Sequence, residues 1–310
     1  MALLDYLRLK AAAIFVRVFG SWMLSSGLKR DLLLEKDTKP TKIKIPSRDK
    51  GRFIKCLLYT PTSPPEKNKT PVLINWHGSG FVAPSLGRDH VYCARIAREA
   101  GIFVLDADYR KGPETRYPGP LNDVEDALLW VASQPHKFDL SCVAVSGFSA
   151  GATLALTASS SLRQTLPENM KISIVVSVYP LTDFSIEPHA RKVDRPVVPI
   201  PPFFLGMFTD CYAPDRTMRT NPRVSPGHAA SALFPDTVVI VTASGDTLAP
   251  EAEDLAVRLK RDGGRRVVSL SVEDARHAFD KGPERGSKEW EQREEAYSLI
   301  VLTLKESFHR

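Results

Sequence analysis

The chain has 310 residues, of which 43% are hydrophobic and 25% are charged, and these fractions are ordinary for a globular protein. This composition excludes an intrinsically disordered chain, and the length lies within the range of one large α/β domain with a cap. The formal net charge is +6, but residues 1–55 hold 13 basic and five acidic side chains, a balance of +8, so the remainder carries −2.

The N-terminal segment predicts an amphipathic helix. Apolar side chains recur there at steps of three and four residues, at Leu3, Leu7, Ala11, Ile14, Phe15, Val18, Phe19, Trp22 and Met23. Arg17 interrupts the apolar run, which argues against a signal peptide and against a membrane-spanning helix. We expect this apolar stripe to lie over the active site that the motifs below define.

The basic excess of the same region indicates a solvated basic face. Attraction to an anionic membrane surface is the alternative, so membrane-surface contact through the N-terminus is one partner interaction to consider. No nucleic-acid recognition motif accompanies the basic residues, and we expect no nucleic-acid partner. The sequence gives no indication of the oligomeric state.

Apolar runs and helical patterns alternate along the rest of the chain. Strands are expected at residues 41–45, 53–59, 72–76, 102–106, 143–145, 172–178, 237–243 and 267–272. Helices are expected at residues 89–100, 121–131, 152–160, 250–261 and 288–307. Such alternation predicts an α/β fold with a mostly parallel sheet of about eight strands and helices on both faces.

The alternation breaks in a proline-rich stretch that ends in an aromatic run. Five prolines lie between residues 188 and 202, and Phe203-Phe204-Leu205-Gly206-Met207-Phe208 follows them. We expect this insertion to be part of a cap, with Phe203, Phe204 and Phe208 lining a substrate pocket.

A glycine-rich turn, His77-Gly78-Ser79-Gly80, follows the third expected strand. Backbone N–H groups in such a turn stabilise the oxyanion of an acyl-transfer reaction when a nucleophile lies downstream. The alternative is a plain turn at the end of a strand, with a buried and hydrogen-bonded histidine.

The pentapeptide Gly147-Phe148-Ser149-Ala150-Gly151 is the most informative motif and reads G-x-S-x-G. It follows an apolar strand and precedes a run of small residues that predicts a helix. A strand, a tight turn and a helix are the context in which such a serine acts as a nucleophile. The N-terminus of the helix also directs backbone N–H groups toward negative charge developing there.

Two further residues complete a catalytic triad in the order Ser, Asp, His. Asp246 and His277 each follow an expected strand, as Ser149 does. Serine needs a general base, and the base needs an acid that fixes its tautomer, so His277 and Asp246 suit these roles. Asp183 also follows a strand and is the alternative acid.

These motifs resemble the hormone-sensitive-lipase-like family of alpha/beta-hydrolase esterases. His77-Gly78-Ser79-Gly80-Phe81 matches H-G-G-G-[FW], Asp108-Tyr109-Arg110-Lys111-Gly112-Pro113-Glu114 matches D-Y-R-L-A-P-E, Gly147-Phe148-Ser149-Ala150-Gly151 matches G-D-S-A-G, Tyr179-Pro180-Leu181-Thr182-Asp183 matches Y-P-x-x-D, and His277-Ala278-Phe279 matches H-x-F. The likeness runs from about residue 71 to the C-terminus. It implies an alpha/beta-hydrolase fold with a helical cap. The expected organisation is an N-terminal cap segment at 1–40, a core at 41–183, a cap insertion at 184–230 and a second part of the core at 231–310.

By this resemblance, the backbone N–H groups of Ser79, Gly80 and Ala150 form the oxyanion hole. Two residues depart from the family pattern. Ser79 replaces a glycine, and its hydroxyl is a candidate for an additional donor. Phe148 replaces the usual acid, so we expect a more apolar pocket wall, with Phe81 and Phe148 among the substrate contacts.

The cysteines indicate no metal site and no disulfide framework. Cys56, Cys93, Cys142 and Cys211 are scattered and lack metal-ligand spacing. We expect reduced thiols in a cytoplasmic protein, with disulfides as the alternative.

The expected activity is that of a serine carboxylesterase acting on a small or medium-sized, largely apolar ester through an acyl-enzyme, without a metal or organic cofactor. One alternative is a biosynthetic enzyme of secondary metabolism that uses the same triad for acyl transfer, lactone opening or cyclisation. The other is a non-catalytic ligand-binding module on a hydrolase scaffold. That alternative predicts a lost triad member, whereas all three are present here.

Overall fold

The computed structural model describes residues 3–23, 25–62 and 69–308, without the side chains of residues 20–25. The expected apolar positions Trp22 and Met23 therefore lie outside the described side chains.

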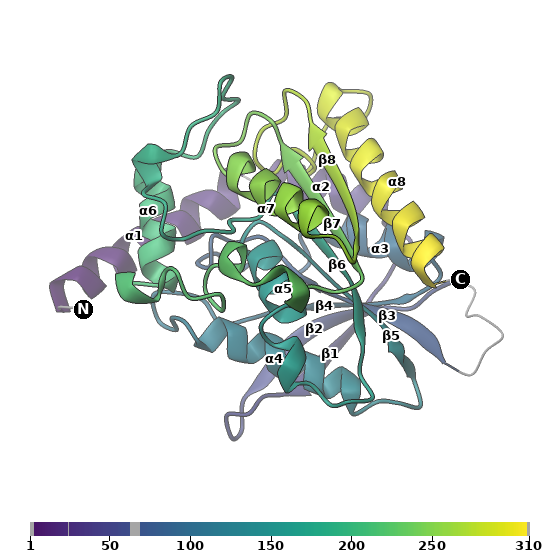
Figure 1. The fold of residues 1–310 in the computed structure, drawn as a ribbon. Coiled ribbons are helices and arrows are strands. Elements are labelled where there is room, and N and C mark those ends of the chain that lie inside the picture. Colours follow the sequence, from purple (N-terminus) through teal and green to yellow (C-terminus); the bar gives the residue numbers. More distant parts are fainter. Residues whose placement is uncertain (1–2, 24, 63–68, 309–310) are drawn as a thin grey trace.

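The centre of the described structure is one eight-stranded sheet, mostly parallel as predicted (Figure 1). Its strands are β1 (Thr41–Pro46), β2 (Phe53–Tyr59), β3 (Thr70–Trp76), β4 (Phe103–Ala107), β5 (Phe138–Phe148), β6 (Ile172–Val178), β7 (Thr237–Ala243) and β8 (Arg266–Val272). Their order is β1-β2-β4-β3-β5-β6-β7-β8. Strand β2 is antiparallel to β1 and β4, and the remaining neighbours are parallel. The central strands are continuous apolar runs because helices cover both of their faces.

The helices that cover the sheet are α3 (His90–Glu99), α4 (Gly119–Ala132), α5 (Ala150–Ser159), α7 (Ala249–Asp262) and α8 (Lys288–Phe308). Alternating strand residues divide the core between the two faces. Ile74 packs in the layer that holds α4, α5 and α7, whereas Leu73 packs in the layer that holds α3 and α8. This alternation follows from the two-residue period of a strand.

Three more helices lie outside these two layers, namely α1 (Leu3–Met23), α2 (Ser25–Leu34) and α6 (Pro202–Tyr212). Short 3₁₀ turns are at Arg163–Thr165, Pro188–Ala190, Arg216–Met218, Pro226–His228 and Ser231–Leu233. Helix α6 belongs to the stretch between β6 and β7, and it lies beside α1 beyond the sheet (Figure 1).

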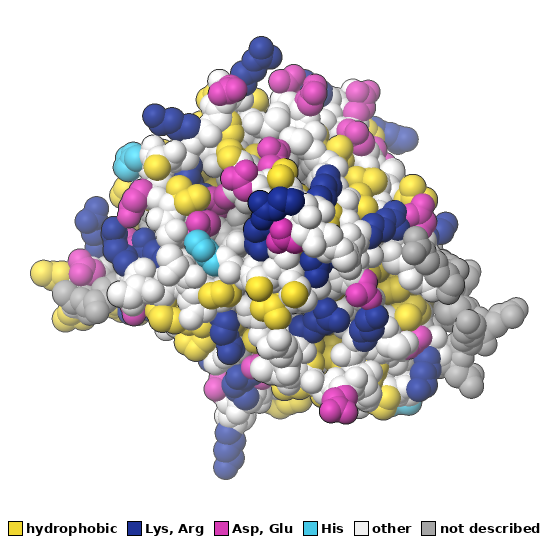
Figure 2. Space-filling model, viewed as in Figure 1, with side chains coloured by type: hydrophobic (Ala, Val, Ile, Leu, Met, Phe, Trp, Pro, Cys, Tyr) yellow, Lys and Arg dark blue, Asp and Glu magenta, His cyan; other side chains and the backbone are white. Residues whose placement is uncertain are grey.

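Helix α1 confirms the expected N-terminal helix, but the expected orientation of its apolar stripe was wrong. The stripe residues with large side chains point outward and are 49–73% exposed, at Leu3, Leu7, Ile14, Phe15, Val18 and Phe19. A second apolar face packs inward, where Ala13 is buried against Val82 and Met207. The yellow side chains at the left edge of Figure 2 lie near the start of α1.

Polar contacts on the inward face of α1 explain this orientation. Arg17 donates hydrogen bonds to both carboxylate oxygens of Glu114, at 2.6 and 2.7 Å. It also donates to the carbonyl oxygens of Val82 at 3.1 Å and Gly112 at 2.9 Å, and Lys10 pairs with Glu114 as well. These contacts fix the rotation of the helix about its axis, and they leave the more apolar stripe exposed.

None of the helices in the described parts of the chain combines the length and apolar character that crossing a membrane requires.

Candidate active site

Ser149 lies in a strained turn between the end of β5 and the start of α5. Its φ of 50° and ψ of −119° are unusual for a residue with a side chain. The flanking glycines leave room for the turn. A Cβ atom at Gly151 would overlap the carbonyl oxygen of Trp76, and one at Gly147 would overlap the backbone of Gly151. The motif therefore needs small residues at both positions.

A chain of hydrogen bonds links Ser149 to His277 and Asp246. The Ser149 Oγ lies 2.9 Å from His277 Nε2, and His277 Nδ1 lies 2.6 Å from Asp246 Oδ2. With the proton on Nδ1, His277 donates to the carboxylate and accepts from the serine hydroxyl. The second Asp246 oxygen accepts the N–H of Leu248 at 3.1 Å, and Asp246 is 1% exposed. The three loops meet because they follow β5, β7 and β8, whose carboxyl ends share one edge of the sheet.

The alternative acid, Asp183, has other partners. One of its oxygens accepts the N–H and the hydroxyl of Ser185, at 2.8 and 2.6 Å. The other pairs with His228 Nε2 at 3.0 Å. Asp246 and not Asp183 is therefore the carboxylate that the structure brings to His277.

The candidate oxyanion-hole residues lie beside Ser149 on two elements. Ser79 and Gly80 belong to the loop after β3, and Ala150 is the first residue of α5; all three line the same pocket as Ser149. The first N–H groups of a helix have no partner within the helix, so the N–H of Ala150 is available to a ligand. Gly80 has a φ of 55°, a conformation that favours glycine.

The Ser79 hydroxyl does not serve as an additional donor in the pocket. Tyr109 donates its phenolic proton to the carbonyl oxygen of His77 at 2.7 Å. The Ser79 Oγ lies 2.6 Å from the same phenolic oxygen, so Ser79 must donate its own proton there. Each hydroxyl has a single proton, which leaves Ser79 none for an ester. The serine instead ties the glycine-rich loop to the D-Y-R-K-G-P-E segment.

The same segment holds His77 in place. Asp108 lies 3.1 Å from His77 Nε2 and accepts a 2.8 Å hydrogen bond from Lys111. Burial lowers the pKa of His77, and the Lys111 cation acts in the same direction. The pKa of Asp108 is lowered by the hydrogen bond from His77 and by Lys111, although burial opposes that shift. His77 is therefore a buried, neutral residue that positions the loop.

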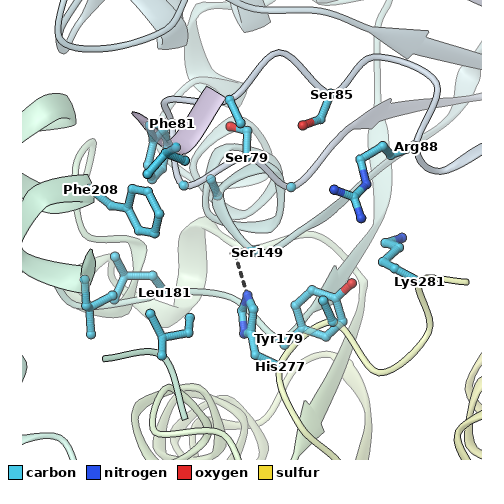
Figure 3. Close-up of a pocket in the computed structure, with 18 of the residues that line it drawn as sticks. Ser79, Phe81, Ser85, Arg88, Ser149, Tyr179, Leu181, Phe208, His277 and Lys281 are labelled. Atoms are coloured by element: carbon cyan, nitrogen blue, oxygen red, sulfur yellow. Dashed lines mark hydrogen bonds between the residues drawn. The ribbon is translucent and has the colours of Figure 1, made fainter. Parts of the chain in front are cut away.

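The pocket has a volume of about 430 Å³ and two chemically different sides (Figure 3). Phe81, Leu181 and Phe208 lie on one side of Ser149, and Ser85, Arg88 and Lys281 lie on the other. The apolar side continues with Phe184, Ile200 and Leu205. An ester carbonyl at Ser149 would have an apolar surface on one side and polar groups on the other.

Two of the five aromatic residues expected to contact substrate line this pocket, namely Phe81 and Phe208. The expectation was wrong for Phe148, Phe203 and Phe204. The Phe148 ring lies in the core on the α3 and α8 side of the sheet, in edge contact with Tyr92 and 3.4 Å from Lys281 Nζ. Phe203 is 60% exposed, and Phe204 packs in the cluster formed with α1. Only one face of α6 is directed at the pocket, and it carries Leu205 and Phe208.

Several pocket residues had no signal in the sequence, notably Arg88 and Lys281. Lys281 belongs to a buried polar cluster beneath the pocket. It donates to Asp89 at 2.7 Å and contacts Asp280 at 2.8 Å. Asp280 in turn accepts hydrogen bonds from the hydroxyl groups of Tyr179 and Tyr297, both at 2.6 Å. No motif relates these residues, because they come from segments far apart in the chain.

The buried polar cluster also includes Asp106, which lies on strand β4. Its carboxyl group accepts from Asn75 at 2.9 Å and from the N–H of Gly87 at 3.1 Å, and Asn75 also donates to Asp89 at 2.9 Å. Burial, reinforced by the Asp89 charge, raises the pKa of Asp106 to about 8. Burial therefore favours the protonated form of Asp106.

Comparisons with known proteins agree with this architecture. A family model described as alpha/beta hydrolase fold matches residues 73–281. The chain is 35% identical over 133 residues to versiconal hemiacetal acetate esterase of Aspergillus parasiticus, which covers 43% of this chain and 40% of that protein. It is 28% identical over 194 residues to esterase LipI of Mycobacterium tuberculosis, which covers 62% of this chain and 60% of that protein. The alignments thus span less than two thirds of either relative.

A solved structure is similar over almost the whole chain. The hyperthermophilic esterase from the archaeon Pyrobaculum calidifontis superimposes with a TM-score of 0.78 at 23% identity. The superposition covers 99% of this chain and 98% of that one. At this identity the similarity concerns the fold, which includes the segments that precede residue 73.

Proposed function

Since the chain belongs to a family with the alpha/beta-hydrolase fold, we propose that it is a serine carboxylesterase for small or medium-sized, largely apolar esters. The observation that carries the proposal is the hydrogen-bonded chain of Ser149, His277 and Asp246 at the wall of a pocket. The esterase names of the two sequence relatives support the same reaction class.

In the proposed reaction, the Ser149 Oγ attacks the ester carbonyl carbon while His277 Nε2 takes its proton. Asp246 holds the His277 tautomer and compensates the charge of the imidazolium. The N–H groups of Ser79, Gly80 and Ala150 stabilise the oxyanion. His277 then protonates the departing alcohol, and an acyl group stays on Ser149. Water, deprotonated by His277, releases the acid and restores the serine.

We also propose that residues 1–40 and 184–230 form a cap on the core segments 41–183 and 231–310. Val16, Arg17 and Leu28 contribute to the pocket lining from the first segment. Leu205 and Phe208 contribute from the second. Contacts of α6 with both α1 and the pocket support a joint role for these segments.

The outward stripe of α1 supports membrane-surface contact as a partner interaction. It presents Leu7, Ile14 and Phe15 to solvent, and the first 55 residues carry a formal charge of +8. Apolar insertion together with attraction of basic residues to anionic lipid is how interfacial helices bind. We propose an anionic membrane surface as the occupant of this face.

The four free thiols support a cytoplasmic location.

A panel of p-nitrophenyl esters of increasing acyl length tests the enzymatic proposal. We expect Ser149-dependent hydrolysis, with Ser149→Ala reducing turnover by on the order of 10⁶-fold. A fluorophosphonate probe should label the wild type on the peptide that carries Ser149 and should not label the variant. Hydrolysis that persists in Ser149→Ala, or a label on another serine, would overturn the assignment.

A further inference from the structure

The polar side of the pocket contains an arginine that has no carboxylate partner among the described residues. The guanidinium of Arg88 points toward the space above Ser149 (Figure 3). Its backbone N–H donates to Ser85 at 3.1 Å, but its side chain forms no ion pair or hydrogen bond with any residue that the structure describes. Arg17, which also lines the pocket, is by contrast held by Glu114. Arg88 is thus a cation available to a ligand.

The neighbouring charges are already engaged with one another. Lys281 contacts Asp89 and Asp280, and its ammonium group lies over the Phe148 ring. The two oxygens of Asp89 accept from Lys281 and Asn75. An incoming anion would therefore find the donors of Arg88 free, while those of Lys281 are occupied.

A second hollow adjoins the pocket on this side. Its volume is about 330 Å³, and Arg88 and Lys281 border both spaces. Arg30 and Arg276 add two more cations, against the carboxylates of Glu284 and Glu289. Arg30 is paired with Glu284, and Lys281 is paired with Asp89 and Asp280. Arg88 and Arg276 are therefore the two cations of this wall for which the described residues provide no carboxylate partner.

We propose that the pocket selects esters that carry a free carboxylate, which Arg88 binds while an apolar portion lies against Phe81 and Phe208. A guanidinium presents two parallel N–H groups that match the two oxygens of a carboxylate. The oxyanion hole fixes the ester carbonyl at Ser149, so the acyl and alcohol parts extend to opposite sides of the nucleophile. The carboxylate is unchanged by the reaction, in which one ester and one water give one acid and one alcohol. This inference rests on the esterase function proposed above and names its substrate class.

Matched ester pairs test the inference and locate the carboxylate. In the acyl series, monoethyl adipate is compared with ethyl hexanoate. In the alcohol series, 4-acetoxybutanoate is compared with butyl acetate. Hydrolysis is followed by titration of the released acid at pH 7.5, and each pair gives a ratio of kcat/KM for the anionic over the neutral ester. We expect a ratio well above one in one series, which identifies the part of the substrate that faces Arg88.

Arg88→Gln should lower that ratio by about 10- to 100-fold, the range for a lost hydrogen bond to a charged group. Arg88→Lys should retain an intermediate ratio, because it keeps the charge and loses the two-pronged geometry. Arg98→Gln, on the surface of α3 and paired with Glu35, is the matched control and should leave the ratio unchanged. High salt should lower the ratio of the wild type.

The outcomes separate the two proposals. Hydrolysis of neutral esters with ratios at or below one in both series would overturn the carboxylate inference and leave the esterase function standing. A ratio that Arg88→Gln does not change would also overturn it. If neither member of any pair, nor any p-nitrophenyl ester, is hydrolysed in a Ser149-dependent way, the proposed function itself fails.

Discussion

Gly80→Ala tests why a glycine is needed in the loop that carries the proposed oxyanion hole. Gly80 has a φ of 55°, and an added Cβ would lie 2.7, 2.8 and 2.9 Å from the Cδ1, Cγ and Cε1 atoms of the Phe208 ring. Left-handed backbone costs a non-glycine residue about 1–2 kcal/mol. The overlap with Phe208 adds a steric cost that the loop or the ring must relieve by moving.

The expected effect is larger on catalysis than on stability. Loss of one oxyanion donor lowers turnover by about 10²- to 10³-fold in other hydrolases. We therefore expect Gly80→Ala to lower kcat/KM for p-nitrophenyl butyrate by about 100-fold, while urea denaturation shows a loss of about 1–2 kcal/mol in the free energy of unfolding. Phe208→Ala is the partner variant, because it removes the ring that the new methyl group meets.

A double-mutant cycle separates the two causes. If the overlap displaces the loop, the double variant should be about ten times more active than the product of the two single effects predicts. Purely additive effects on kcat/KM would show that Phe208 does not transmit the damage. Near-normal activity of Gly80→Ala would refute the expectation that the added methyl group displaces the loop, because alanine keeps the backbone N–H.

Three further predictions concern the acid, the buried carboxyl group and the outward stripe. Asp246→Asn should reduce turnover by about 10⁴-fold with the fold retained, and Asp183→Asn should have a much smaller effect. If steady-state kinetics show the larger loss for Asp183→Asn, the assignment of Asp246 as the triad acid is wrong. The pKa of Asp106 is raised in the folded protein, so its stabilising contribution is complete below about pH 4 and is progressively lost toward pH 8. We compare the free energy of unfolding of the wild type with that of Asp106→Asn. The difference, wild type minus variant, should decrease between pH 5 and 8 by at most about 1.4 kcal/mol per pH unit. A constant difference in urea titrations would contradict this assignment. Ile14→Ser combined with Phe15→Ser should weaken co-sedimentation with phosphatidylserine-containing vesicles without loss of esterase activity, whereas equal binding of both proteins would refute the membrane proposal.

Local sequence patterns were sufficient for the elements of the fold and for the order of the reactive groups. Runs of β-branched residues and helical periodicity predicted the eight strands and the helices around them, because these patterns depend on neighbours close in the chain. The elbow around Ser149 was predictable for the same reason: Gly147 and Gly151 are required by contacts of the turn itself and of the adjacent strand. The meeting of Ser149, Asp246 and His277 follows from a general property of parallel sheets, whose strand ends share one edge.

The expected aromatic contacts show where local patterns stop being informative. Phe203, Phe204 and Phe208 are equivalent as apolar residues in a run, yet only Phe208 faces the pocket. The rotation of α6 against α1 and the core decides which of them does. The expectation for Phe148 was wrong because the last residue of β5 directs its ring into the core layer that holds α3 and α8.

Helix α1 also shows what a local sequence pattern predicts and what it leaves open. Its period correctly predicted a helix, but it has two apolar faces, and the ion pairs with Glu114 determine which one turns inward. The sequence alone therefore determined the eight strands, helix α1 and the helices that cover the sheet, the strand-end positions of the reactive residues and the class of fold. Tertiary packing decided the direction of each side chain, the partner of the Ser79 hydroxyl and the lack of a carboxylate partner for Arg88 among the described residues. Those properties depend on partners that lie far away in the chain and meet only in the folded protein.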